Sequence, residues 1–309
     1  EERSPGPVLG ELTGLGLVIG SYDSGGTIDI LVLDTGEVFE LPGVPGRPVG
    51  MVDQSLVASR YGEIFVADLS KPEPEPKTVF DAENGWNDYV EVDDGRIWTI
   101  ADDAETLSMV AYSVDGELID SVDLSLLGSG FGWPIMTGAS DLVQSSAGGV
   151  FRRVGSDFER LSTGRLRTVG NELALVDECD DRLRCRSRWH RVDDWTELDL
   201  PAPSFDADAF STVAGDDRWL LTTNWRSSEM TLTEVATGEV VRTWSDSLFY
   251  GYGDEVPISE DGRWLVDAGR GLGPSMVDLD SGTEWPIDIR FSGDAAILIV
   301  DLAGTAFAG

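Results

Sequence analysis

The chain has 309 residues, of which 41% are hydrophobic, and this is enough to bury a substantial core in one large domain or two ordinary ones. Acidic residues number 57 against 22 lysines and arginines, which gives a formal net charge of −35 at pH 7. Such a charge argues against a nucleic-acid or anionic-membrane binder, because the field of the whole protein repels phosphate.

The cationic residues are as biased as the acidic ones. Lys71 and Lys77 are the only two lysines, and the other 20 cations are arginines. An Asp-rich, Lys-poor composition is typical of a salt-adapted protein, but a GC-rich genome also replaces lysine by arginine, and both explanations stay open. No apolar run approaches the roughly 20 residues of a membrane helix, so we expect no transmembrane segment in this chain.

The first residues carry no repeat signal, and we predict that residues 1–13 form an N-terminal linker. The chain begins at Glu1 and not at Met, which suggests that a leader or membrane anchor has been removed or left out. The remaining residues, 14–309, contain the internal repeats that predict the fold.

Two kinds of turn recur along these repeats. The first joins two short β-rich runs, and its glycines are spaced by 80, 122 and 44 residues, close to two, three and one periods of about 41 residues. These glycines are Gly36, Gly116, Gly238 and Gly282. The second kind precedes an apolar strand, leads the first by 20 or 21 residues, and occurs at 94–98, 216–220 and 261–265. Two markers that keep one offset over three copies are a strong repeat signal.

Each repeat is expected to form a four-stranded antiparallel meander, because Asp-Gly permits tight hairpins and the flanking runs are β-branched or aromatic. One such sheet cannot bury both of its faces, whereas radial stacking of several sheets buries them. We therefore predict an all-β fold, a single seven-bladed β-propeller with almost no helix. The blades are expected at about 14–43, 48–82, 88–124, 131–163, 165–200, 208–245 and 254–289.

One repeat resembles a known family. The phrase at 259–266, Ser-Glu-Asp-Gly-Arg-Trp-Leu-Val, is similar to the Ser-Pro-Asp-Gly-(Arg/Lys)-Trp-Leu phrase of TolB-type, WD-like β-propeller repeats. The copies at 94–98 and 216–220 are weaker, and in the other four repeats the likeness is only topological. The resemblance implies a propeller and no particular activity, because such propellers serve as binding platforms, protease gates and enzymes.

Closure of the ring depends on the last apolar run, at residues 295–300. We predict that it joins the first blade as its innermost strand and so links the two ends of the propeller. Residues 7–12 are the competing candidate for that position, and the C-terminal run would then begin an eighth blade.

In a meander propeller, the connections from a fourth strand to the next blade and from a second to a third strand open on one face, here called the loop face. Aromatic residues with adjacent glycines gather on these connections, and such rings stack on sugars or peptides while arginine or aspartate orients them. The alternative is that they pack over neighbouring blades and seal the ring. The residues predicted for a ligand-binding face are Trp86, Tyr89, Phe131, Trp133, Trp225, Arg226, Phe249, Tyr250 and Tyr252. Arg60 and Tyr61 lie on a second-to-third-strand connection of the same face.

Residues 152–191 hold ten of the twenty arginines, and we call them the Arg cluster. Four of these arginines share one parity, which places them on one face of a strand and suggests a basic docking patch for an anionic partner. They are Arg182, Arg184, Arg186 and Arg188. The alternative is that they pair with acids of adjacent blades along their apolar stems.

Two cysteines, Cys179 and Cys185, are separated by five residues, which suits a disulfide across the mouth of a hairpin. The pair does not suit a zinc site, because zinc needs four ligands and the chain has one histidine besides the two cysteines. Two free thiols in a cytosolic protein remain an alternative. A disulfide favours an exported protein that is extracellular or exposed at the cell envelope.

Enzymatic chemistry finds little support in the sequence. His190 lies among arginines, and no Gly-x-Ser-x-Gly elbow supplies a nucleophile for it. Aspartate doublets occur at 93–94, 102–103, 180–181, 193–194 and 216–217, but none matches a calcium loop, so we expect no cofactor, and calcium has no specific motif behind it.

We therefore predict a non-enzymatic, exported propeller that binds a protein or glycan partner at the cell envelope, with self-assembly through the Arg cluster as a variant. The alternative is a carbohydrate-active hydrolase or lyase that uses two carboxylates at the mouth of the propeller.

Overall fold

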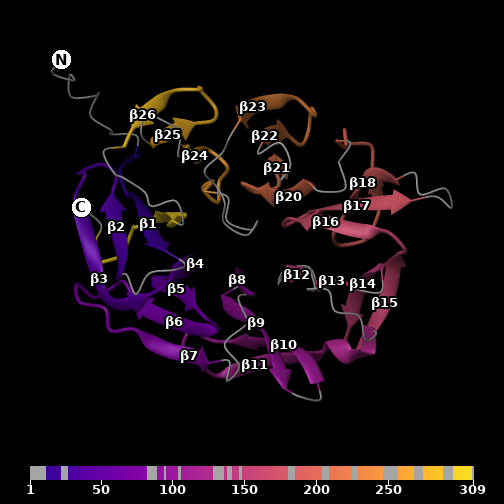
Figure 1. Ribbon diagram of the computed structural model, residues 1–309, viewed down its shortest axis with the longest axis horizontal. Coiled ribbons are helices and arrows are strands. Elements are labelled where there is room, and N and C mark those ends of the chain that lie inside the picture. Colours follow the sequence, from indigo (N-terminus) through magenta and orange to yellow (C-terminus); the bar gives the residue numbers. More distant parts are fainter. Residues whose placement is uncertain are drawn as a thin grey trace.

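The computed structural model describes residues 12–21, 27–81, 89–93, 95–103, 106–127, 136–137, 141–145, 148–179, 185–203, 209–224, 229–245, 257–267, 274–287 and 295–307. Its strands form seven antiparallel sheets arranged as a ring (Figure 1). The predicted all-β, seven-bladed propeller is therefore confirmed. Within the described ranges, no helix is long and apolar enough to cross a membrane.

Blade 1 joins the two ends of the ring. It contains β27 (Ala295–Asp301), β1 (Leu15–Ser21), β2 (Thr27–Val32) and β3 (Val38–Pro45), in that order. Blade 2 follows with β4 (Arg47–Val52), β5 (Ser55–Arg60), β6 (Glu63–Asp68) and β7 (Lys77–Asp81).

Blades 3 to 5 repeat this order. Blade 3 has β8 (Val90–Asp93), β9 (Arg96–Asp103), β10 (Thr106–Tyr112) and β11 (Leu118–Asp123), followed by the short 3-10 helix η2 (Leu124–Leu127). Blade 4 has β12 (Met136–Thr137), β13 (Leu142–Gln144), β14 (Val150–Val154) and β15 (Asp157–Ser162). Blade 5 has β16 (Arg165–Val169), β17 (Leu173–Cys179), β18 (Cys185–Arg191) and β19 (Glu197–Leu198).

Blades 6 and 7 differ from each other, because only blade 6 has a full innermost strand. Blade 6 has β20 (Ala209–Ala214), β21 (Trp219–Asn224), β22 (Glu229–Glu234) and β23 (Val240–Ser245). Blade 7 has three named strands, β24 (Trp264–Asp267), β25 (Ser275–Asp278) and β26 (Glu284–Pro286). Ile258 forms an isolated antiparallel bridge to Leu265, at the place where the other blades carry a first strand.

The turns between third and fourth strands have one hydrogen-bonding pattern. At Gly36, φ is 72°, its N–H donates to the carbonyl of Val32, and the N–H of Val32 donates to Glu37. The same two hydrogen bonds and a positive φ recur at Gly238 and Gly282. Gly116 also has a positive φ, but its turn is one residue shorter, because its N–H donates to Ser113 and the N–H of Ser113 donates to Glu117. A side chain at these positions would be strained, so the recurring glycines specify the hairpins as the sequence predicts.

The Asp-Gly turns between first and second strands bring adjacent blades together. The Trp219 side chain of blade 6 donates from Nε1 to the carbonyl of Gly262 in blade 7, at 2.6 Å. A Cβ on Gly215 would lie 2.3 Å from the Cα of Gly262. The second recurring turn therefore has a packing role, because glycine allows the two backbones to touch.

The C-terminal strand closes the ring as predicted. β27 pairs with the whole of β1, from Leu15 opposite Asp301 to Ser21 opposite Ala295. The chain then continues along blade 2, where the N–H of Ala306 donates to the carbonyl of Leu69 at 2.8 Å. Phe307 is buried against Phe39 with ring centroids 5.2 Å apart, so the tail adds a second contact between blades 1 and 2.

The core lies between neighbouring sheets. Leu302 is fully buried in a cluster that includes Val18 of blade 1 and Leu56 of blade 2. An ion pair also crosses between blades 3 and 4, where both terminal nitrogens of Arg153 reach the Asp120 carboxylate at 2.6 and 2.8 Å. The blades are therefore joined by apolar packing and by polar contacts.

Candidate functional site

Of the nine residues predicted for the ligand-binding face, Tyr89 lies within the described residues. Its hydroxyl donates to Glu91 at 2.6 Å, and its ring packs against the cluster around Trp98 and Met109. This half-buried ring helps to fill the space beside blade 3. The other eight predicted residues lie outside the described residues: Trp86, Phe131, Trp133, Trp225, Arg226, Phe249, Tyr250 and Tyr252.

The connection between β5 and β6 presents a different arrangement on the loop face. Tyr61 is 54% exposed, and the Arg60 guanidinium carbon lies 5.3 Å from the centroid of its ring. Nε of Arg60 is buried without a hydrogen-bond partner, and Arg60 makes no ion pair with any described residue. An exposed aromatic ring and an unpaired guanidinium thus lie side by side.

This connection has the backbone of a tight hairpin. Tyr61 and Gly62 have φ values of 49° and 84°, and Arg60 pairs with Glu63 across the turn. Positive φ at both central residues is the signature of a type I′ turn, which strongly favours Asn-Gly. Tyrosine occupies the position at which local conformation favours asparagine.

Neighbouring glycines let the backbone pack tightly around Arg60. A Cβ on Gly46 would lie 2.1 Å from the carbonyl oxygen of Ser59 and 2.8 Å from Cβ of Arg60. Arg47 is buried beside them and donates from Nε to the Ser59 hydroxyl at 3.0 Å. The end of β5 is therefore held firmly, and Arg60 and Tyr61 are presented from a rigid support.

The Arg cluster divides between paired and unpaired side chains. Arg188 contacts Glu178 at 3.4 Å and also donates to Glu197, so it is paired within blade 5. Arg186 is exposed and makes no ion pair within the described part of the chain. Arg182 and Arg184 lie outside the described residues. The proposed docking patch therefore retains Arg186 as an unpaired cation, whereas the charge of Arg188 is met by acids.

Most other arginines of the cluster have partners. Arg153, Arg167 and Arg191 contact Asp120, Asp177 and Asp194, respectively. Two more donate to backbone carbonyls, Arg152 to Val192 and Arg160 to Ser162. Arg165 is exposed without an ion pair in the described ranges. Structural pairing therefore accounts for the larger part of this cluster.

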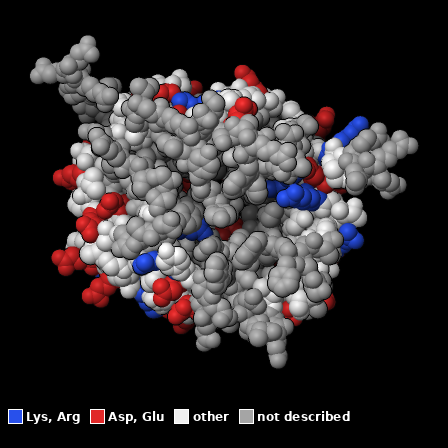
Figure 2. All heavy atoms as spheres, viewed as in Figure 1, with Lys and Arg blue, Asp and Glu red and all other residues white. Residues whose placement is uncertain are grey.

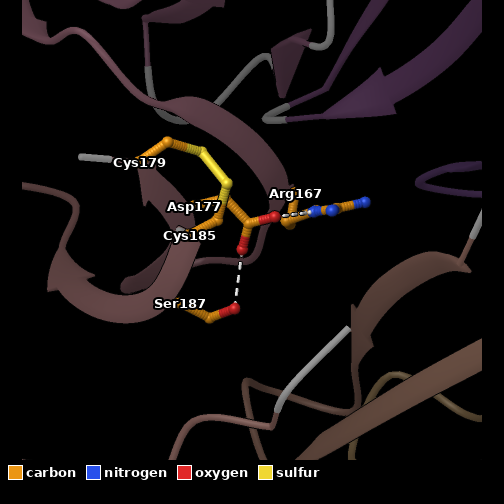
Figure 3. The surroundings of a disulfide bond; sticks show 5 residues. All are labelled: Arg167, Asp177, Cys179, Cys185 and Ser187. Carbon is orange, nitrogen blue, oxygen red and sulfur yellow. Dashed lines mark hydrogen bonds and ion pairs between the residues drawn. A yellow bond between two sulfur atoms is a disulfide. The ribbon is translucent and has the colours of Figure 1, made fainter. Parts of the chain in front are cut away.

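Cys179 and Cys185 form a disulfide, as predicted, and they are directly opposed on β17 and β18. The carboxylate of Asp177 is buried beside them and accepts hydrogen bonds from Arg167 Nε and from the Ser187 hydroxyl, the latter at 2.6 Å. Figure 3 shows the Arg167 side chain pointing away from the disulfide. The disulfide indicates an oxidising compartment, and this network ties β16, β17 and β18 together.

His190 occupies a buried position on blade 5. Its ring stacks on Trp195 with centroids 4.7 Å apart and planes 13° apart, and Nδ1 lies 3.4 Å from the Trp195 carbonyl. Nε2 is buried without a partner. No serine or carboxylate within the described residues is hydrogen-bonded to this ring, which contributes to packing.

In the aspartate doublets that the structure describes, carboxylates accept hydrogen bonds from backbone N–H groups of turns. Asp217 accepts backbone N–H groups of Asn171 and Leu173 at 2.9 and 3.0 Å, which joins blades 5 and 6. Burial raises the pKa of its carboxyl, against these hydrogen bonds, which lower it. Within the described residues, no three His, Cys, Asp or Glu side chains are grouped so that they could hold a metal ion.

On the face shown in Figure 2, the described acidic side chains lie mainly around the perimeter, and several basic side chains lie closer to the middle. The net charge of the whole chain is −35. An unpaired arginine on such a protein attracts an anionic group locally, whereas the long-range field repels a highly charged polyanion.

Comparison with solved structures shows similar folds at low sequence identity. A proposed 6-phosphogluconolactonase of Bacteroides fragilis has a TM-score of 0.57 and 14% identity, with 96% of this chain and 100% of that chain covered. Apo AztD of Citrobacter koseri has a TM-score of 0.55 and 10% identity, with coverage of 94% and 98%. A functionally unknown protein of Desulfotomaculum acetoxidans has a TM-score of 0.59 and 13% identity, with coverage of 93% and 99%.

These similarities support the propeller fold, but they do not indicate the function of this chain, because one fold serves many activities. No protein-family model and no curated protein sequence match the chain.

Proposed function

We propose that this chain is a non-enzymatic propeller that binds a glycan or protein partner through its loop face. The observation that carries the proposal is the pair Arg60 and Tyr61: Tyr61 is 54% exposed, and the Arg60 guanidinium beside its ring makes no ion pair with a described residue. Loops on a rigid scaffold commonly carry recognition, and side chains of these two types commonly anchor ligands.

The proposal includes a place outside the cytoplasm, extracellular or exposed at the cell envelope. The Cys179–Cys185 disulfide supports it, because such bonds persist mainly in oxidising compartments. The repeat phrase at 259–266 supports membership among TolB-type, WD-like propellers, which is also part of the proposal.

Binding fits the described geometry better than hydrolysis does. A glycosidase needs two carboxylates about 5–10 Å apart on either side of the substrate. The carboxylates of Asp216 and Asp217, one of the described doublets, are instead engaged with Asn171 and its neighbours across the boundary between blades 5 and 6. This pair supports the scaffold.

The proposed function can be tested by thermal unfolding at fixed salt in the presence of calcium, neutral oligosaccharides, uronic acids and purified envelope glycans, combined with binding to a glycan array. A ligand that binds only the folded state raises stability by about 2.7 kcal/mol at a hundredfold excess over Kd. We expect at least one glycan class to raise the unfolding midpoint and to bind on the array.

The double variant Arg60→Gln/Tyr61→Asn locates the effect. Loss of the midpoint shift in this folded variant supports binding at the loop face. A shift that persists unchanged places the ligand elsewhere and contradicts that part of the proposal. Turnover of a bound glycan by the wild-type protein would overturn the non-enzymatic assignment.

A further inference from the structure

Six described residues other than glycine have positive φ, and they fall into two groups. Asp53, Asp141, Asp216 and Asp217 tolerate this conformation, because their short polar side chains can bond locally. The other two are aromatic, Tyr61 and Trp195. Aromatic side chains gain no such local bond, so each needs another reason to occupy its turn.

Packing supplies the reason for Trp195. Its ring stacks on His190 and contacts the buried cluster around Val150 and Leu166. Tyr61 has no comparable contact with the core: its residue is 54% exposed, and its one ring partner in the described structure is Arg60. A backbone outlier that no packing among the described residues explains is an indication of function.

Arg60 is equally unusual in its charge environment. The chain has 57 acids, yet no described carboxylate pairs with Arg60, although Glu63 lies directly across the hairpin. Its buried Nε has no acceptor, which leaves a donor unsatisfied in the free protein. Nε itself is closed to a ligand, but the terminal nitrogens of Arg60 are neither buried nor hydrogen-bonded to a described residue, so an incoming carboxylate can pair with both of them in a bidentate contact.

The position of the pair within the sheet restricts the kind of ligand. β5 and β6 are the two central strands of blade 2, with β4 and β7 paired to their outer sides. A peptide cannot add a strand at this point, because these strands present no unpaired edge. A small cyclic ligand with a negative charge needs only the Tyr61 ring for stacking and the Arg60 guanidinium for its charge.

The charge of the ligand is restricted as well. The net charge of −35 repels long polyanions, whereas a short ligand with a few carboxylates experiences a smaller repulsion. We propose that Arg60 and Tyr61 bind a uronic acid residue of a glycan, with the carboxylate on the Arg60 guanidinium and the sugar ring against Tyr61. This inference rests on the proposed binding function and names its ligand class.

The inference is tested by titration calorimetry of the intact chain with trigalacturonate and with the neutral galactose trimer, in moderate salt. We expect the acidic trimer to bind the wild-type protein and the neutral one to bind at least about tenfold more weakly, which corresponds to about 1.4 kcal/mol. Arg60→Gln should weaken binding of trigalacturonate by about tenfold or more, because the carboxylate loses its partner.

Three further variants make the result specific. Arg165→Gln removes an exposed arginine on blade 5 that makes no ion pair with a described residue and lies outside the proposed docking patch, and it should leave the affinity unchanged. Tyr61→Asn removes the ring while asparagine suits the positive φ, so this variant should remain folded and bind more weakly. Arg60→Lys keeps the charge without the planar fork and should bind less tightly than wild type.

Equal affinity of Arg60→Gln and wild type for trigalacturonate would overturn the inference and leave the proposed function standing. Tighter binding of the neutral trimer, or of a tetraglutamate peptide, would overturn the ligand class. An absence of trigalacturonate binding overturns the inference in the same way, and the glycan array then decides separately whether the proposed function fails with it.

Discussion

Single side chains decide how the blades hold together, and Asp120 provides a measurable case. The hydrogen bond from Arg153 is the main cause that lowers the pKa of Asp120 below its ordinary value of 3.8. A carboxyl whose pKa is lowered on folding contributes stability above its unfolded pKa and loses that contribution as the pH falls through its folded pKa. The ion pair should therefore stabilise the protein at neutral pH and fade in acid.

We expect Asp120→Asn to lower the free energy of unfolding by about 1 kcal/mol at pH 7 and by progressively less below pH 4. Urea unfolding at a series of pH values measures the difference. Asp157→Asn is the matched control, because Asp157 is an exposed carboxylate on blade 4 with no bonded partner in the described structure. If wild type and Asp120→Asn differed in free energy of unfolding by the same amount at every pH, the ion pair with Arg153 would not be the cause of the difference.

The sequence predicts the turn residues where local conformation governs them. Gly36 and Gly116 occupy positive φ as expected, because only the backbone is involved. Trp195 takes the corresponding position in blade 5, and no sequence rule signals it, because its support is the stack on His190. Tyr61 is placed on the loop face by the repeat pattern alone, but its turn geometry and the unpaired state of Arg60 need the structure.

Partners of charged residues are harder to predict than their faces. Strand parity places Arg186 and Arg188 on one face of β18. In the pairing register Glu178 lies directly opposite Arg186, which would make these two residues the expected ion pair. The structure shows Glu178 in contact with Arg188 instead. Side-chain rotamers decide such choices, and sequence periodicity carries no information about them.

Among the structural elements, the β17–β18 hairpin has its own covalent restraint. The disulfide closes a short loop, and the chain-entropy relation gives such a loop about 2 kcal/mol of stabilisation. We expect reduction with dithiothreitol to lower the free energy of unfolding by about this amount, as measured by urea denaturation. The Cys179→Ser/Cys185→Ser variant should match the reduced protein and show no response to dithiothreitol; a response there would assign the effect to the reagent.

The tail after β27 shows what the repeat pattern misses. The sequence predicts the closing strand from its apolar run but gives no sign that Ala306 and Phe307 continue onto blade 2. These contacts join segments that lie far apart in the chain and outside any period, so the repeat pattern carries no sign of them.

Leu302 tests whether this closure is important for stability. It is fully buried, and a Cβ on Gly16 would lie 2.6 Å from its Cδ1, so the surrounding packing is tight. Leu302→Ala should cost about 2–5 kcal/mol in a urea titration, through lost burial and a cavity. Leu118→Ala, at a residue that is 59% exposed, should change stability by less than about 0.5 kcal/mol. Similar effects from both variants would contradict a stabilising role for the closure.

The complete ring carries a charge that should make its stability depend on salt. At −35, repulsion among carboxylates opposes folding, and added salt screens it by shortening the Debye length from about 10 Å at 0.1 M to about 3 Å at 1 M. We expect the thermal midpoint at pH 7 to rise between 0.1 and 1 M NaCl. Near pH 4, close to the sequence pI of about 4.1, the rise should largely disappear. An equal rise at both pH values would assign the effect to salting-out instead of screening.

The pairing of β27 with β1 also determines when the protein can finish folding during its synthesis. The two strands are separated by more than 270 residues, so blade 1 lacks its inner strand until β27 has been synthesised and has left the ribosome. Contacts between such distant segments form slowly, and until then β1 presents an open edge on which another chain could pair. A nascent chain that is held in solution before this final strand arrives is therefore the form most exposed to aggregation.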